Sequence, residues 1–160
     1  MSITELAPAK LNLTLDVGAR RPDGYHEITS VMQSAALYDV VTLETVETDD
    51  IVLECPGTDL PTGPDNLAWK AADVFFRETN IPRTGIIIRL EKKIPSQAGL
   101  GGGSSDAAAV LRGMRRLFGA NLSDEALETM AARVGSDVPY CVRGGTALAR
   151  GRGERLTALS

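Results

Sequence analysis

Three observations predict an α+β fold. The first 55 residues read as alternating strands, apolar residues at helical spacing gather after residue 65, and the chain closes on a hairpin pattern. With 160 residues, of which 43% are hydrophobic and 24% charged, the chain can bury one core without disulfides or metals. We therefore expect a single domain over residues 1–160.

The first strand is expected over Lys10–Val17, where apolar and polar residues alternate strictly. The face predicted to be half-buried carries Leu11, Leu13, Leu15 and Val17. The opposite face carries Lys10, Asn12, Thr14 and Asp16. A turn at Pro22-Asp23-Gly24 follows, because these residue types favour turns. Further strands are predicted over 28–32, 39–45 and 50–54.

The helices have recognisable starts. Asp65 is the expected N-cap of a helix that continues to about Glu78, and Ser123 caps another with acidic residues in its first turn. Gly135 is expected to end that helix. Between them, a strand that starts at Ile86 and ends near Lys93 leads through a glycine-rich loop into a helix that ends near Phe118. The segment 146–159 is predicted to form a β-hairpin.

Charge and cysteine content exclude several classes. The net charge of −4 argues against general nucleic-acid binding, so we interpret the late arginines as a solvated hairpin surface: Arg143, Arg150, Arg152 and Arg155. Cys55 and Cys141 form no CxxC pair, which favours reduced thiols and a cytoplasmic location. The single histidine, His26, excludes multi-histidine metal sites. No apolar segment is long enough to span a membrane and no secretory signal is visible, so no membrane partner is expected.

The glycine-rich loop predicts an anion site. It consists of Pro95, Ser96, Gln97, Ala98, Gly99, Leu100, Gly101, Gly102, Gly103, Ser104 and Ser105, between a strand and a helix. Glycines let successive N–H groups converge on a phosphate, and the helix N-terminus adds partial positive charge. The loop lacks the lysine of a Walker A motif and the third glycine of a Rossmann motif. A flexible loop or a crowded helix entry is the weaker alternative.

This loop resembles the nucleotide loop of the GHMP kinases. Three more stretches carry the resemblance in the same order: Pro8–Leu13, Arg21–Glu27 and Gly135–Pro139. It implies an N-terminal, ATP-binding domain with a mixed or antiparallel sheet and helices on one side. It also implies a transferase that moves the ATP γ-phosphate, with Mg²⁺, to the 2-hydroxyl of 4-(cytidine 5′-diphospho)-2-C-methyl-D-erythritol, in the non-mevalonate (MEP) route of isoprenoid and terpenoid biosynthesis.

The resemblance assigns roles residue by residue. Lys10 and Asp137 are expected to be catalytic, with Asp137 as general base, although a surface lysine and a capping aspartate are the ordinary uses of such positions. Asn12, Tyr25 and His26 are expected to bind the substrate, the last two its cytosine.

The nucleotide is assigned to the glycine-rich loop and to Asn66, for which helix capping is an equal alternative. Metal ligands stay open. Ser104, Ser105 and Asp106 lie where they could reach a metal at the phosphates, but a helix N-terminus explains them equally well. Asp106 receives no catalytic role.

Other functions stay open at this point. A homoserine or mevalonate kinase of the same family is one alternative, and a non-catalytic nucleotide-binding or RNA-binding module is another. The sequence does not determine the oligomeric state. Family members continue into a second α+β domain, so we expect this chain to lack one wall of its cleft and to turn over weakly or not at all alone.

Overall fold

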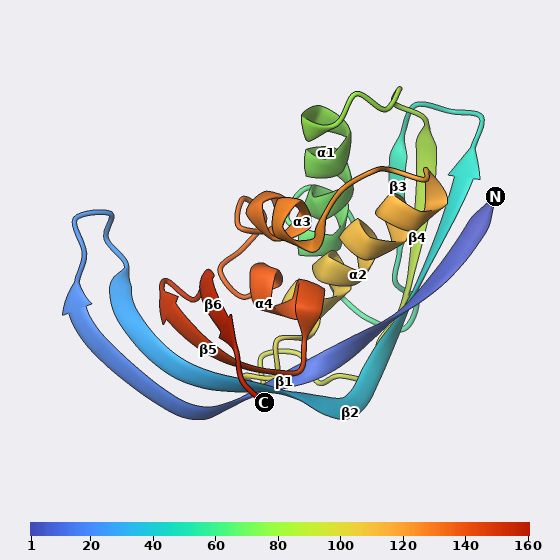
Figure 1. Ribbon diagram of the computed structural model, residues 1–160. Helices are drawn as coiled ribbons and strands as arrows, with labels where there is room; N and C mark the ends of the chain where they lie inside the picture. Colours follow the sequence, from blue (N-terminus) through green and yellow to red (C-terminus); the bar gives the residue numbers. More distant parts are fainter.

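The computed structural model describes all 160 residues as one six-stranded sheet with four helices on its concave face (Figure 1). The strands are β1 (Ser2–Arg20), β2 (His26–Val46), β3 (Ile51–Glu54), β4 (Gly85–Glu91), β5 (Thr146–Gly151) and β6 (Arg155–Ala158). The helices are α1 (Leu67–Glu78), α2 (Gly102–Leu117), α3 (Asp124–Ala131) and α4 (Val138–Arg143). The predicted fold class is therefore confirmed. No helix is long and apolar enough to cross a membrane.

Strand β2 organises the sheet. Its 21 residues form one continuous strand where the sequence analysis predicts two, over 28–32 and 39–45. One edge of β2 pairs with β4 and β5, and β1 pairs along the other, all antiparallel. Only β3 runs parallel to its neighbour, β4. The paired β1 and β2 curve past the helices as a long hairpin (Figure 1).

The predicted burial of Leu11, Leu13, Leu15 and Val17 is wrong: all four are 39–62% exposed. The pairing of β1 with β2 shifts between Asn12 and Thr14, which is the signature of a β-bulge. Leu15 is therefore opposite Ser30 and shares the concave face with it. The four apolar residues therefore do not all lie on one face of the sheet. The helices also do not extend far enough along the hairpin to cover these residues.

The core lies between the concave face and the helices. Phe75 of α1 stacks on Phe118 at the end of α2, with ring centroids 6.2 Å apart, and Phe76 meets both rings. Aromatic pairs at such separations contribute about 0.5–1.5 kcal/mol beyond their buried area. The sheet contributes fully buried residues such as Leu43, Ile86 and Ile88. The core holds α2 against the sheet, and the N-terminus of α2 bears the glycine-rich loop.

Helix boundaries differ from prediction in two places. The N-cap of α1 is Asn66 rather than Asp65, and its side chain accepts a hydrogen bond from the Ala68 N–H. Helix α3 starts after Ser123 as predicted but ends at Ala131, four residues before Gly135. The freed residues form a turn that delivers Asp137 to the start of α4. The C-terminal hairpin of β5 and β6 matches its prediction.

Candidate active site

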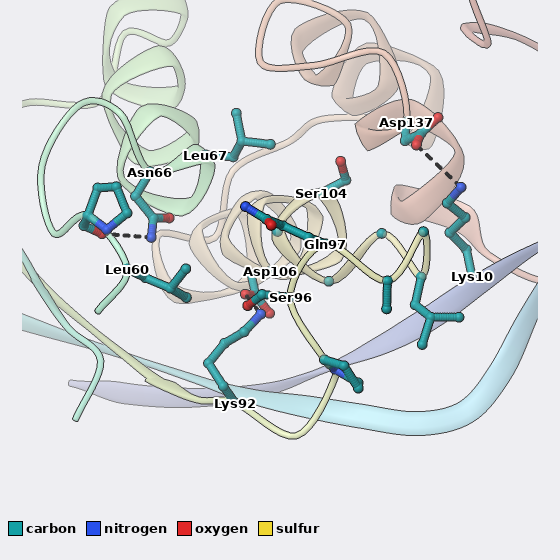
Figure 2. A pocket seen from close by; sticks show the side chains of 18 of the residues that line it. Lys10, Leu60, Asn66, Leu67, Lys92, Ser96, Gln97, Ser104, Asp106 and Asp137 are labelled. Atoms are coloured by element: carbon teal, nitrogen blue, oxygen red, sulfur yellow. Dashed lines mark hydrogen bonds and ion pairs between the residues drawn. The ribbon is translucent and has the colours of Figure 1, made fainter. Parts of the chain in front are cut away.

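A cleft of about 470 Å³ opens along the glycine-rich loop. Its walls come from β1, from the segment before α1, from the loop and from the start of α4, as Figure 2 shows. This volume lies within the range of small-molecule sites. Among the predicted residues, the cleft brings together Lys10, Asn66, Asp137 and the loop from Pro95 to Ser104. Ser105 is fully buried behind the loop, where its hydroxyl donates to the Pro8 carbonyl at 2.6 Å.

The backbone of the loop has the conformation of an anion cradle. Gln97, Gly99 and Gly101 have positive φ angles, whereas the residues between them do not. Such alternation is the pattern of a nest, in which successive N–H groups point at one anion. Gln97 adopts φ +57° without being glycine, a strained conformation that often marks a functional loop. No side chain caps α2, so its first N–H groups remain free for a ligand.

Gly101 is also required by a close approach. A Cβ atom at this position would lie 2.7 Å from Cγ of Lys10, and φ is +65°. The backbone N–H of Lys10 donates to the Leu100 carbonyl at 2.9 Å. The loop therefore packs directly on β1 at the predicted catalytic lysine, which explains why a glycine stands there.

Lys10 and Asp137 face each other across the cleft (Figure 2). The Lys10 ammonium lies 3.6 Å from the Asp137 carboxylate and donates to Asn12 Oδ1 at 2.6 Å. Lys10 is only 7% exposed, whereas the Asp137 side chain is 36% exposed. Although Asp137 occupies the N-cap position of α4, its carboxylate caps no N–H group. Its oxygens are therefore available to a substrate, and the capping alternative is not realised.

Asn12 links this pair to the sheet. Its Nδ2 donates to Ser30 Oγ at 2.8 Å, and that hydroxyl donates to the Thr14 carbonyl at 2.7 Å. Because Asn12 Oδ1 accepts from Lys10, both ends of the amide are engaged. Asn12 thus orients the lysine ammonium, and the bulge after Asn12 supplies the carbonyl that completes the chain.

A second lysine lies at the other end of the loop. Lys92 donates to Asp39 at 2.5 Å and to Asp106 at 2.6 Å, and both carboxyl groups are buried. Asp39 also accepts from the backbone N–H groups of Lys93 and Ile94, at 2.6 and 2.9 Å. These bonds fix the segment that leads into the loop. Lys92 and Asp106 both line the cleft (Figure 2).

The pKa values of the two carboxyl groups around Lys92 are shifted in opposite directions. Burial disfavours ionisation of Asp39, but hydrogen bonds from its neighbours, including Ile94 and Lys92, lower its pKa. Burial raises the pKa of Asp106 to about 8, and the Asp39 carboxylate adds to the effect. Oδ1 of Asp106 is buried without a partner. The surroundings therefore favour the charge on Asp39 and the proton on Asp106.

Asn66 serves two purposes in the structure. Its Oδ1 caps α1 through the Ala68 N–H at 2.9 Å, and its Nδ2 donates to the Pro61 carbonyl at 2.9 Å. Helix capping is therefore realised. Asn66 also lines the cleft opposite the loop, so the predicted contact with a nucleotide stays a prediction.

Tyr25 and His26 lie outside this cleft, at the tip of the β1–β2 hairpin. Tyr25 is 49% exposed, and His26 Nδ1 is 3.1 Å from the Gly18 carbonyl. Beside them, Arg152 stacks on the Tyr25 ring and Arg155 pairs with Glu27. The interpretation of the late arginines as a solvated surface is therefore wrong for Arg152.

Sequence reasoning missed the Asp39–Lys92–Asp106 cluster and the partner of Tyr25. A signal for the cluster exists, because Asp39 interrupts the apolar run from Leu37 to Val41, where a buried charge needs a partner. Nothing in the sequence pairs Arg152 with Tyr25, since 127 positions separate them and the contact depends on how the hairpin curves.

Residues 66–145 match the family model of the GHMP kinases N terminal domain. The chain belongs to the GHMP kinases. The matched GHMP segment spans α1 to α4 and includes the glycine-rich loop and Asp137. Lys10 and Tyr25 precede it.

Two curated relatives carry the same name. The chain is 50% identical over 159 residues to the 4-diphosphocytidyl-2-C-methyl-D-erythritol kinase of Pelotomaculum thermopropionicum, covering 99% of this chain and 55% of the relative. It is 47% identical over 160 residues to the Bacillus subtilis enzyme of that name, again with 55% of the relative covered. The chain thus spans about half the length of the curated relatives it matches.

Solved structures agree on the fold. A crystal structure of 4-(cytidine 5′-diphospho)-2C-methyl-D-erythritol kinase superposes with a TM-score of 0.82 at 42% identity, covering 99% of this chain and 55% of that one. The Methanococcus jannaschii mevalonate kinase superposes over the whole chain and 56% of its own length, with a TM-score of 0.75 at 16% identity. At that identity, the second likeness shows the shared GHMP fold alone.

Proposed function

We propose that this chain is the N-terminal, ATP-binding half of a kinase that phosphorylates the 2-hydroxyl of 4-(cytidine 5′-diphospho)-2-C-methyl-D-erythritol. The observation that carries the proposal is the cleft in which Lys10 and Asp137 face each other beside an uncapped helix N-terminus. The names of relatives at 47–50% identity support this substrate over those of homoserine or mevalonate kinases. The reaction belongs to isoprenoid precursor synthesis, and we place it in the cytoplasm.

The nucleotide phosphates would bind along the loop from Ser96 to Ser104. The positive φ angles of Gly99 and Gly101, together with the free N–H groups of α2, favour an anion there. The adenine would lie towards Leu60 and Asn66, at the end of the cleft that is away from Lys10. The γ-phosphate would then approach the gap between Lys10 and Asp137.

The chemistry follows from that pair. The Asp137 carboxylate accepts the proton of the substrate hydroxyl, whose oxygen attacks the γ-phosphorus while the bond to the bridging oxygen of ADP breaks. The Lys10 ammonium, held by Asn12, stabilises negative charge on the reacting oxygens. Because Lys10 is buried, its charge is less screened than a surface lysine would be.

A magnesium ion would accompany the nucleotide and neutralise charge on its phosphates. The described residues form no cluster of three or more candidate side-chain ligands, which fits an ion held largely by phosphate oxygens and water. Asp106 is already engaged with Lys92, and Ser105 with Pro8. The Ser104 hydroxyl lines the cleft and is the candidate protein oxygen for the ion.

Activity of this half alone is expected to be weak. The cleft is open, so water enters, raises the local dielectric and weakens the attraction between the protein and the transferring phosphoryl group. The relatives are nearly twice as long, and the part of them beyond this match would supply a further wall of the cleft.

The test is a phosphorylation assay with ATP and 4-(cytidine 5′-diphospho)-2-C-methyl-D-erythritol. The chain is compared with a version extended through the second half found in its relatives, and homoserine and mevalonate serve as competing acceptors. We expect turnover of the cytidyl substrate alone, with a much higher kcat/KM in the extended version. Preferential phosphorylation of homoserine or mevalonate would overturn the proposed substrate, and equal kcat/KM in both versions would show that this half suffices.

Tyr25→Ala tests the proposed cytosine contact in the same assay. Loss of a stacking ring costs about 1–3 kcal/mol per base, so the KM for the cytidyl substrate should rise about tenfold while the KM for ATP stays constant. An unchanged KM for the cytidyl substrate would remove Tyr25 from the substrate site.

A further inference from the structure

The side chain of Arg152 contacts both the tip of the β1–β2 hairpin and the turn before α4. Its guanidinium carbon lies 3.8 Å from the centroid of the Tyr25 ring, at the tip of the β1–β2 hairpin. Its Nη2 lies 3.5 Å from Ser136 Oγ, where it donates a hydrogen bond. Ser136 directly precedes Asp137, which faces Lys10. One side chain thus spans from the hairpin tip to the residue beside the proposed general base.

The turn that bears Arg152 is held in place from both sides. The Arg152 backbone N–H donates to Glu154 at 2.7 Å, and the Gly151 N–H donates to Glu27 at 2.9 Å. Glu27 also accepts from Arg155 at 2.6 Å. Because Glu27 lies on β2 immediately after the hairpin tip, these bonds fix the β5–β6 turn relative to Tyr25. The backbone of Arg152 is therefore held at a fixed place relative to the ring on which its side chain stacks.

Tyr25 keeps one face open. A guanidinium over a tyrosine ring covers a single face, and the residue is still 49% exposed. Its backbone is anchored, because its N–H donates to Asp23 Oδ1 at 3.0 Å and its carbonyl accepts from the Arg21 N–H at 2.6 Å. The ring is thus held at its backbone and on one face, and the other face is available.

We propose that Arg152 is a positioning residue for the pyrimidine base of the substrate: it covers one face of Tyr25 and holds the ring so that the base stacks on the other. This inference rests on the proposed function. An ordered ring loses less conformational freedom when the base arrives, so part of the cost of binding is met in advance. The contact of Arg152 with Ser136 fixes the position of the Tyr25 ring relative to Asp137.

Two other roles for Arg152 give different results. If its charge held the diphosphate, its removal would weaken only ligands that carry phosphate. If it occupied the face that the base needs, its removal would strengthen base binding. Arg150 provides a matched control, because it lies two positions away in the same hairpin and its side chain makes no hydrogen bond or ion pair.

The experiment measures binding of cytidine and of cytidine 5′-diphosphate to the chain by NMR. His26 is the only histidine and adjoins Tyr25, so its imidazole signals report this site alone. In Arg152→Leu we expect the Kd for both probes to rise by the same factor, about fivefold, as for loss of a cation–π contact. Arg150→Leu should match the wild type, and Arg152→Lys should fall between. In a Tyr25→Ala background, Arg152→Leu should add nothing.

Each result decides something. An unchanged or lower Kd in a folded Arg152→Leu variant, or a loss for the diphosphate alone, overturns the inference and leaves the proposed function standing. Signal dispersion in the spectrum verifies folding, and Arg152→Gln, which keeps a flat side chain, replaces Arg152→Leu if that variant fails to fold. If the wild type binds neither probe, the proposed cytidine site itself is overturned.

Discussion

Two lysines flank the glycine-rich loop, and their surroundings are opposite in design. Lys92 is enclosed by Asp39 and Asp106 at 2.5–2.6 Å, and none of the three side chains is more than 9% exposed. Lys10 meets Asp137 at 3.6 Å, and that carboxylate is a third exposed. The tight cluster has no room for a third reactant. The loose pair leaves oxygens of Asp137 uncommitted, so the same two chemical groups provide an anchor at one end and a reactive gap at the other.

The difference shows that the distance between a lysine ammonium and its carboxylate partners decides whether the group holds the fold together or is free to meet a substrate. A lysine that is enclosed by two buried carboxyl groups keeps its charge and its partners, because losing that charge would leave a buried carboxylate without a counter-charge. A buried lysine with one distant partner and one amide can exchange that partner for a substrate. Five substitutions test this difference between the two lysines, and they are taken from the largest expected effect to the smallest.

Asp137→Asn should abolish turnover in the extended version of the enzyme. Removing a general base costs about 10²–10⁴-fold in rate, while the loop and α2 still bind ATP with unchanged affinity. Steady-state kinetics and nucleotide titration measure the two effects. Asp65→Asn is the control, since Asp65 lines the same cleft without an ion pair. Near-normal kcat in the Asp137 variant would contradict its assignment as the base.

Lys92→Met should lower the free energy of unfolding by about 3–5 kcal/mol, because it leaves the Asp39 charge buried and unpaired. Lys10→Met should cost less, since Asp137 remains in contact with water. Urea denaturation measures both. Lys93→Met, whose side chain is 60% exposed, should stay within about 0.5 kcal/mol of the wild type. Equal losses at positions 92 and 10 would erase the distinction between anchor and reactive gap.

Asp106→Asn should change how stability depends on pH. The folded protein holds the Asp106 proton up to about pH 8, whereas the unfolded chain releases it near pH 4. Folding therefore takes up a proton between these values, and this stabilising contribution, complete below pH 4, is lost as the pH rises through 8. The slope is at most about 1.4 kcal/mol per pH unit. The variant should lack it in urea titrations from pH 5 to 9; parallel profiles would show that Asp106 is ionised when folded.

Gly101→Ala should cost about 1–3 kcal/mol of stability, because alanine at positive φ is strained and its Cβ would displace Lys10. We expect a matching fall in kcat through the displaced ammonium. Gly63→Ala is the control, since a Cβ there meets nothing within 4 Å and φ is not positive. Denaturation and kinetics together measure the change, and a neutral Gly101→Ala variant would mean that the loop does not constrain Lys10.

The sequence supports most of the fold and the centre of the site. Local signals sufficed for β3, for the start of α3 at Ser123 and for the final hairpin, because each depends on residues near in sequence. The resemblance points to Lys10, Asp137 and the glycine-rich loop as site residues; the structure gathers them in one cleft, and their roles stay predictions.

The predictions that the structure contradicts, and the features that the sequence did not reveal, depend on contacts between segments that are distant in the sequence. The bulge after Asn12 is set by the register of β1 against β2, and no alternation within β1 reveals it. The surroundings of Lys92, which follows β4, depend on Asp39, 53 positions away on β2. Likewise, Asn66 rather than Asp65 caps α1 because its amide can also reach the Pro61 carbonyl. Each outcome is decided by tertiary contacts that override local preference.

Strand β2 has a consequence for how the molecule opens. Residues 28–33 pair with β1 and β5, and residues 40–44 pair with β1 and β4, so neither stretch can detach without breaking ladders at both edges, whereas residues 35–37 between them have no strand partner. In hydrogen exchange, these two doubly paired stretches should therefore be protected up to the global unfolding free energy, while residues 35–37 and the outer edge of β1 exchange through shallow local openings.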